Sequence, residues 1–166
     1  MWLDQLIARL TGLSGPLGLP DLVRLMKQFA PQAGELTPFI RFEATSYTRT
    51  CVVEGRHAVL LVLCWKAGQS SPIHNHRNSA CCVRVCDGVA IETSYDVTTD
   101  PTRPRPLTRR RLQRGTVTGS WDRDAHRIEA VEQCISLHLY SPPLALNRME
   151  LFPDEATGAT RPAHAV

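Results

Sequence analysis

From Gly34 onward the chain consists of short runs of alternating or β-branched residues, separated by turn residues, and these runs lack a helical period. The runs expected to form strands are "RHAVLLVLCW", "CCVRVCDGVAIETSY", "GTVTGS", "HRIEAVE" and "CISLHLYS". Many short strands without helices between them are typical of a β-sandwich or barrel. The pattern therefore predicts an all-β fold.

Residues 1–32 have a different pattern, with apolar side chains three and four positions apart. The segments "MWLDQLIARL" and "DLVRLMKQFA" both show it, and the Gly- and Pro-rich segment "TGLSGPLGLP" separates them. We expect two short amphipathic helices that pack on the β-fold.

The length of 166 residues suits one domain with its own core. Residues 36–153 are expected to form an antiparallel, jelly-roll-like β-barrel. Residues 154–166 are small, polar and unpatterned, and they predict a loose C-terminal tail. The whole chain, 1–166, is thus interpreted as a single domain.

The net charge of +3 is small, and most of the excess lies in Arg103–Gly115. That stretch contains prolines and has no aromatic residues that could stack on bases, so we interpret it as a solvated loop between two strands, and no nucleic-acid partner is expected. Asp4 and Arg9 interrupt the N-terminal apolar run, which argues against a signal peptide, and no run reaches the roughly 20 apolar residues of a membrane span. We expect a cytoplasmic monomer that binds no membrane.

Five of the six cysteines lie in apolar runs and are expected to be buried: Cys51, Cys64, Cys82, Cys86 and Cys134. A reducing compartment makes a disulfide framework improbable. The sequence contains no CxxC pair, which disfavours a closed zinc-ribbon site.

The stretch "SSPIHNHRNSACCVRVCDG" places His74 and His76 one residue apart, so both point to the same face of a strand. Two imidazoles on the inner wall of a barrel need polar partners, and a metal ion is the natural one. Alone, however, such a pair can also be two strand histidines with no metal.

The spacing around this pair resembles the first motif of the cupin family, a small antiparallel β-barrel that binds a metal inside. Further along, Gly115 and His126 stand at the separation of the second cupin motif, although that match rests mainly on His126. The resemblance implies a site of His74, His76 and His126. Cupins place a glutamate ligand where this sequence has Ala80 and Cys81, so the ligand set contains no carboxylate. Three neutral ligands would leave Fe(II) its full charge and open positions for a thiolate and oxygen.

The chain is also similar to thiol dioxygenases of the cysteine dioxygenase family, from about Thr37 to about Pro153. The stretches that carry this similarity are "YTRT", "LCWKAGQSSPIHNH", "DGVAIETSYD", "AHRIEA" and "SLHLYSPPL". The resemblance implies an enzyme that oxidises L-cysteine with O2 to cysteine sulfinic acid at one Fe(II).

It also implies roles for individual residues. Arg49 would pair with the substrate carboxylate and Tyr47 would line the same pocket. Tyr140 would direct its hydroxyl at the substrate and oxygen, with His138 and Ser136 as an outer relay. The alternation of these last three residues places them on one face of a strand.

Cys81 falls where some family members carry a cysteine joined to the tyrosine that matches Tyr140, which predicts a Cys81–Tyr140 thioether; a plain core cysteine is the alternative. The resemblance also implies a cis peptide bond between Ser141 and Pro142. Glu92 and Tyr95 are interpreted as strand and turn residues without a catalytic role.

Three alternative functions remain open on the sequence. One is a dioxygenase of the same family for another small thiol, such as 3-mercaptopropionate or cysteamine. The second is a non-catalytic metal-binding cupin that senses or stores a ligand. The third is a zinc or nickel cupin with isomerase or lyase activity, since three histidines also suit those metals.

Overall fold

The computed structural model describes residues 2–31, 34–144 and 149–154, and within them it contains two α-helices, one short 3-10 helix and ten strands. The helices are α1 (Trp2–Thr11), α2 (Leu19–Gln28) and the 3-10 helix η1 (Thr37–Phe39). The strands are β1 (Thr48–Glu54), β2 (Val59–Trp65), β3 (Ile73–Asn75), β4 (Ala80–Asp87), β5 (Val89–Asp96), β6 (Arg105–Gln113), β7 (Val117–Trp121), β8 (Ala125–Ala130), β9 (Cys134–Ser141) and β10 (Glu150–Phe152).

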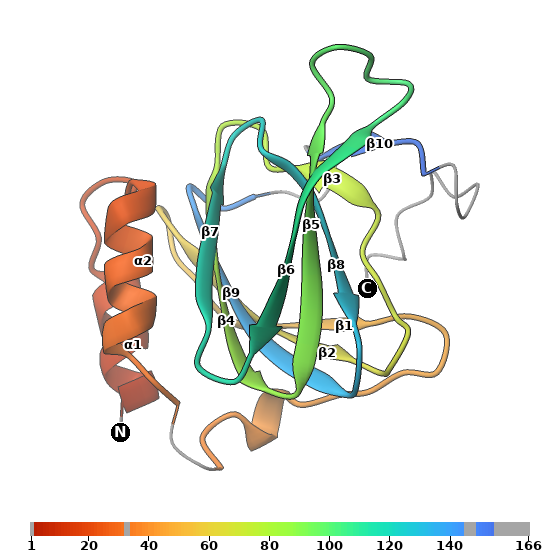
Figure 1. The fold of residues 1–166 in the computed structure, drawn as a ribbon. Coiled ribbons are helices and arrows are strands. Elements are labelled where there is room, and N and C mark those ends of the chain that lie inside the picture. The colour runs from red at the N-terminus through yellow and green to blue at the C-terminus, as the bar shows by residue number, and fades with distance from the viewer. Residues whose placement is uncertain (1, 32–33, 145–148, 155–166) are drawn as a thin grey trace.

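The strands form two five-stranded sheets, ordered β1-β2-β9-β4-β7 and β10-β3-β8-β5-β6 (Figure 1). Apolar side chains from both sheets, including Leu63 and Val83 from the first and Ile128 from the second, form one buried cluster between them. In the described residues strand pairing stays within each sheet, so the all-β prediction is confirmed as two facing sheets rather than a closed barrel.

The inner strands β2 and β9 of the first sheet are buried on both faces, because both α-helices cover the outer side of this sheet (Figure 1). Leu137 and Leu139 of β9 pack toward the helices with Leu22 and Met26 of α2, whereas Tyr140 belongs to the cluster between the sheets. A strand buried on both faces has a near-continuous apolar sequence, as in the "VLLVLCW" of β2. This sheet carries Arg49 and Tyr140, whereas His74 and His126 lie on the second sheet.

Gly119 of β7 allows α2 to approach this sheet closely. A Cβ atom at that position would lie 2.6 Å from Leu19 Cδ1 and 3.3 Å from Val23 Cγ2. The helix begins with Pro20 in its first turn, followed by Asp21, and both residues suit a helix N-terminus.

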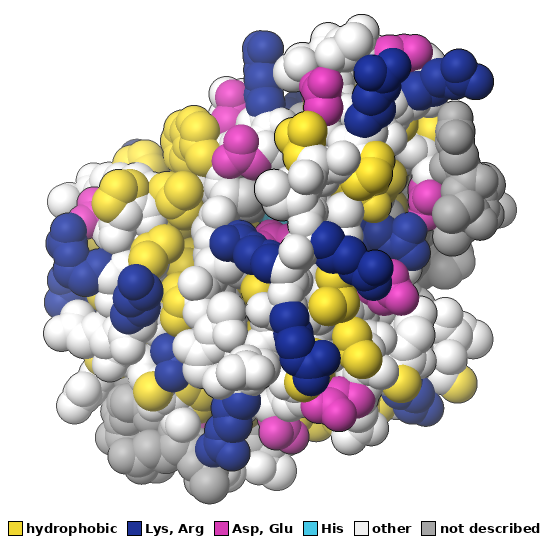
Figure 2. Space-filling view, viewed as in Figure 1, with side chains coloured by type: hydrophobic (Ala, Val, Ile, Leu, Met, Phe, Trp, Pro, Cys, Tyr) yellow, Lys and Arg dark blue, Asp and Glu magenta, His cyan; other side chains and the backbone are white. Residues whose placement is uncertain are grey.

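The expected loop at Arg103–Gly115 is wrong over most of its length, because Arg105–Gln113 forms β6 at one edge of the second sheet. Of its residues only Leu112 is buried. An exposed edge strand tolerates arginines and a proline on both faces, so it lacks the apolar alternation that reveals a strand. Figure 2 shows lysine and arginine side chains spread over the face of the molecule that carries β5 and β6.

The expected burial of five cysteines is correct for Cys64, Cys82 and Cys134 but wrong for Cys51, and Cys86 is only partly buried. Cys51 lies on β1, an edge strand, with its side chain exposed. None of the six cysteines forms a disulfide. Neither α-helix of the described chain is long and apolar enough to cross a bilayer. The tail expected over 154–166 lies, apart from Asp154, outside the described residues.

Candidate metal centre

Three buried histidines from two distant segments meet in the second sheet. His74 on β3 is directly opposite His126 on β8 in the antiparallel register, and His76 follows β3. One ligand atom from each residue lies within 4.8 Å of those of the other two. The structure thus brings together the three residues that the sequence predicts as metal ligands.

Each of these imidazoles has a polar partner at Nδ1. The partners are the Pro72 carbonyl for His74 at 2.9 Å, Ser120 Oγ for His76 at 3.1 Å, and Glu92 Oε1 for His126 at 2.8 Å. A carbonyl and a carboxylate can only accept, so His74 and His126 carry their hydrogen on Nδ1 and keep the lone pair of Nε2 free. Such outer partners orient metal-binding histidines.

The Nε2 atom of His76 is buried and has no hydrogen-bond partner among the described residues. A buried nitrogen without a partner is costly, and a metal ion between the three rings would satisfy it. Burial, followed by the neighbouring His126, lowers the pKa of both His74 and His76 well below the usual value. The rings of His74 and His76 are therefore neutral, which is the form that binds a metal. The residues fit a mononuclear metal site.

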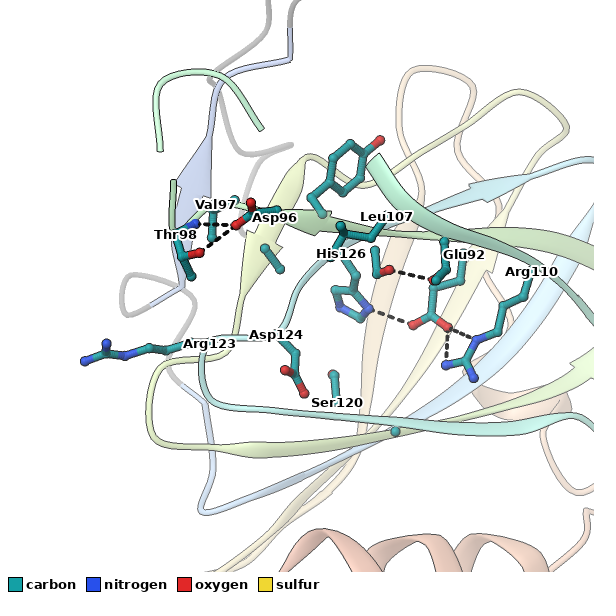
Figure 3. A pocket seen from close by; sticks show the side chains of 15 residues that line it. Glu92, Asp96, Val97, Thr98, Leu107, Arg110, Ser120, Arg123, Asp124 and His126 are labelled. Atoms are coloured by element: carbon teal, nitrogen blue, oxygen red, sulfur yellow. Dashed lines mark hydrogen bonds and ion pairs between the residues drawn. The ribbon is translucent and has the colours of Figure 1, made fainter. Parts of the chain in front are cut away.

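The sequence reasoning missed two outer partners of the metal centre, Ser120 and Glu92. Glu92 lies buried on β5, accepts a hydrogen bond from His126 and forms an ion pair with Arg110 at 2.6 Å (Figure 3). It also accepts a hydrogen bond from Thr118 Oγ1 at 3.2 Å. Burial alone would raise the pKa of Glu92, but His126 and Arg110 outweigh that effect and lower it to about 2. A charged residue inside an otherwise half-apolar strand was the available sequence signal.

A pocket of about 560 Å³ opens behind the metal centre. Figure 3 shows Glu92, Ser120 and His126 on its wall, so the pocket reaches the outer partners of two ligands. Tyr95, interpreted as a turn residue, lies on β5 and also lines this pocket.

Arg49 and Tyr47 form a second group of site residues. Arg49, on β1, donates from Nη2 to Tyr47 Oη at 3.1 Å, and its guanidinium lies 5.4 Å from the centroid of the Tyr47 ring. Its Nη1 lies 3.9 Å from Met149 Sδ. In the part of the chain that the structure describes, no carboxylate pairs with this half-buried cation, so it can bind an anionic group of a ligand.

Ser136, His138 and Tyr140 lie along one face of β9 and are connected by hydrogen bonds. His138 Nε2 is 3.0 Å from Ser136 Oγ, and His138 Nδ1 is 3.3 Å from Tyr140 Oη. Burial and then the Arg49 charge lower the pKa of His138 to about 3, and burial raises the pKa of Tyr140 well above its usual value. The Tyr140 ring lies 5.5 Å from that of His76, so this group reaches the metal ligands.

Cys81 lies directly opposite Tyr140 in the pairing of β4 with β9. Its side chain is in the cluster between the sheets, whereas Cys82 packs toward the helices. Burial raises the pKa of the Cys81 thiol well above its usual value. The Ser141–Pro142 peptide bond is cis.

The sequence model of the family described as cysteine dioxygenase type I matches residues 18–151. The chain belongs to the cysteine dioxygenase type I family. It is 32% identical over 140 residues to cysteine dioxygenase type 1 of Danio rerio, covering 78% of this chain and 68% of that protein. It is 29% identical over 135 residues to the Rattus norvegicus protein of the same name, covering 76% and 66%. The prediction of an enzyme of this family is confirmed, and the chain spans about two thirds of the length of these relatives.

Solved structures with this fold support the cupin prediction. A protein from Klebsiella pneumoniae with a double-stranded β-helix domain has a TM-score of 0.60 at 16% identity, covering 73% of this chain and 91% of that one. An RmlC-like cupin from Desulfovibrio desulfuricans has a TM-score of 0.53 at 22% identity, covering 69% and 99%. The cupin fold expected for this family is therefore confirmed.

Proposed function

We propose that the protein oxidises L-cysteine with O2 to cysteine sulfinic acid, with a mononuclear Fe(II) held by His74, His76 and His126. The observation that carries the proposal is the convergence of three buried imidazoles in a chain of the cysteine dioxygenase type I family. When bound, the iron would supply open positions for the thiolate and for oxygen and would keep the thiol deprotonated.

The guanidinium of Arg49 would bind the substrate carboxylate through two parallel N–H donors. Tyr47 accepts a hydrogen bond from that guanidinium and lies against it, which restricts its orientation. Tyr140 would place its hydroxyl beside the reacting sulfur and oxygen atoms, since its ring is next to His76. Its pKa is raised well above the usual value, so the hydroxyl keeps its proton and acts as a hydrogen-bond donor.

The reaction balances without a second cofactor. One thiol and one O2 give one sulfinic acid, both oxygen atoms end on sulfur, and the four electrons that oxygen needs come from that sulfur. The sequence agrees with this, because it contains no glycine-rich dinucleotide fingerprint.

Cys81 and Tyr140 are further proposed to form a thioether. Their pairing across β4 and β9 places the thiol beside the ring. The reaction removes the S–H hydrogen and one ring hydrogen and forms a carbon–sulfur bond, and the two hydrogens with their two electrons reduce one O2 to hydrogen peroxide. The phenol oxygen is not consumed and remains available to the substrate.

The decisive experiment measures O2 consumption by anaerobically iron-loaded protein with L-cysteine, with the product identified by mass. We expect one sulfinic acid per O2. Comparison with 3-mercaptopropionate and cysteamine tests the alternative substrates. Iron binding without O2 uptake from any thiol would support a binding module, and activity only after zinc or nickel reconstitution would support the other metal chemistry.

A further inference from the structure

Trp65 connects the two groups of residues around the metal centre. It is 1% exposed at the end of β2. Its indole Nε1 donates to Ser136 Oγ at 2.9 Å, and its ring stacks on Tyr47 with centroids 4.1 Å apart and planes inclined by 17°. The Trp65 side chain therefore contacts both Tyr47, the partner of Arg49, and Ser136, the first residue of the Ser136–His138–Tyr140 group.

The indole contact fixes the direction of the first hydrogen bond. An indole N–H can only donate, so Ser136 Oγ is an acceptor toward Trp65. Among the described residues, the remaining polar partner of this hydroxyl is His138 Nε2, at 3.0 Å. A buried hydroxyl hydrogen without an acceptor is costly, so Ser136 donates to that nitrogen.

The imidazole of His138 sets the direction of the next hydrogen bond, to Tyr140. Because His138 is buried near the Arg49 cation, it is neutral and carries one hydrogen. Its Nε2 accepts from Ser136, so that hydrogen is on Nδ1 and is donated to Tyr140 Oη, 3.3 Å away. The tyrosine hydrogen is then not held by His138. The other partner of the Tyr140 hydroxyl is the Cys81 sulfur, which is a weak acceptor. The tyrosine hydrogen therefore remains available to a ligand.

We propose that Trp65 is a positioning residue that sets the direction of the hydrogen bonds from Ser136 through His138 to Tyr140, so that Tyr140 presents its hydrogen to the bound substrate. The consequence for catalysis rests on the proposed function. The hydrogen position on His138 does not, and it can be measured without turnover.

The test is 15N NMR of histidine-labelled full-length protein loaded with Zn(II), which is diamagnetic. The His138 signals are assigned by their loss in His138→Gln. In the parent protein we expect the hydrogen on Nδ1. In Trp65→Phe, which keeps a ring under Tyr47 but removes the N–H, we expect a mixture of both tautomers.

A second readout is the activity of iron-loaded Trp65→Phe. Its kcat should fall about tenfold, the size of one lost hydrogen bond, with a smaller change in KM.

Three variants complete the design. Trp121→Phe, at a tryptophan that is 47% exposed, should change neither the tautomer of His138 nor kcat. Ser136→Ala removes the hydroxyl that accepts from the indole and keeps the indole itself. This variant should also give a mixture of both tautomers of His138. In the Ser136→Ala background, Trp65→Phe should have no further effect on the tautomer, because the indole acts through that hydroxyl.

A parent protein with the hydrogen on Nε2 of His138 would overturn the proposal. An unchanged tautomer in Trp65→Phe would also overturn it, even if kcat fell, because Trp65 would then only support the ring of Tyr47. If instead the tautomers behave as expected and iron-loaded protein oxidises no thiol, the proposed function fails while the hydrogen-bond direction stands.

Discussion

The carboxylate of Glu92 orients His126 and is itself held by Arg110 and Thr118. Outer partners of this kind change metal affinity or activity about 10–100-fold when they are removed. Glu92→Ala should therefore weaken iron binding by about that factor, as measured by anaerobic competition with a chelator. Glu129→Ala, an exposed carboxylate on β8, is the control. Equal affinities for the two variants would contradict the assigned role.

Arg49 should determine the preference for a carboxylate-bearing thiol. Arg49→Ala should reduce kcat/KM for L-cysteine by about 30-fold or more, because removal of one partner of a buried charge pair costs about 2 kcal/mol or more. Cysteamine lacks a carboxylate and serves as the internal control. The ratio of the two kcat/KM values is the measurement, and a ratio equal to that of the parent would show that Arg49 does not bind the carboxylate.

The Cys81–Tyr140 thioether predicts a mass change. Iron-loaded protein exposed to L-cysteine and O2 should lose two hydrogen atoms, as measured by intact-mass spectrometry, and a peptide containing both residues should appear after digestion. Cys81→Ala should abolish the change. Cys82→Ala should retain it, because that side chain packs toward the helices. Loss of the crosslink in Cys82→Ala but not in Cys81→Ala would show that Cys82, and not Cys81, forms the thioether.

At the level of elements, α2 stabilises the sheet that carries β9. Leu22 is fully buried between them, and truncation of a buried leucine costs about 2–5 kcal/mol. Leu22→Ala should therefore lower the free energy of unfolding by about that amount in urea titrations. Leu107→Ala, at a leucine that is 65% exposed on β6, should change it by less than about 0.5 kcal/mol. Similar losses in both variants would contradict this packing role.

The elements also show where sequence reasoning succeeds. β2 was predictable because burial on both faces gives it a long apolar run, and β9 because its apolar residues alternate with Ser136 and His138. β6 was not, since both of its faces are exposed and its residues follow no apolar period. The alternation in β9 could place Ser136, His138 and Tyr140 on one face, but not the indole on a neighbouring strand that contacts them.

At the level of the whole molecule, the metal should bind the folded chain and stabilise it. Anaerobic Fe(II) at about 100 times its dissociation constant should add about 2.7 kcal/mol and raise Tm, and a chelator should reverse the shift. His126→Ala should lose the response in thermal unfolding, whereas His57→Ala, outside the metal centre, should keep it. A metal-dependent shift of equal size in His126→Ala would contradict the three-histidine site.

The fold and the three ligands could be predicted because strand periodicity and motif spacing are local properties of the sequence. Glu92 could not be assigned, because its contact with His126 depends on how β5 pairs with β8. The position of Trp65 between Tyr47 and Ser136 likewise depends on the pairing of β2 with both of its neighbours. Contacts between side chains on different strands can be predicted only when the register of the strand pairing is known, and a single sequence does not give that register.

β9 and β3 differ in how firmly they are anchored. β9 is the central strand of the helix-covered sheet and pairs along most of its length with β2 and β4. β3 has three residues, pairs with β8 only at His74 and His126, and has the equally short β10 as its other neighbour. Local opening is easiest where few backbone hydrogen bonds must break. We therefore expect β3 to open more readily than β9, so that an ion held by His74 and His76 could leave and return while Tyr140 stays ordered.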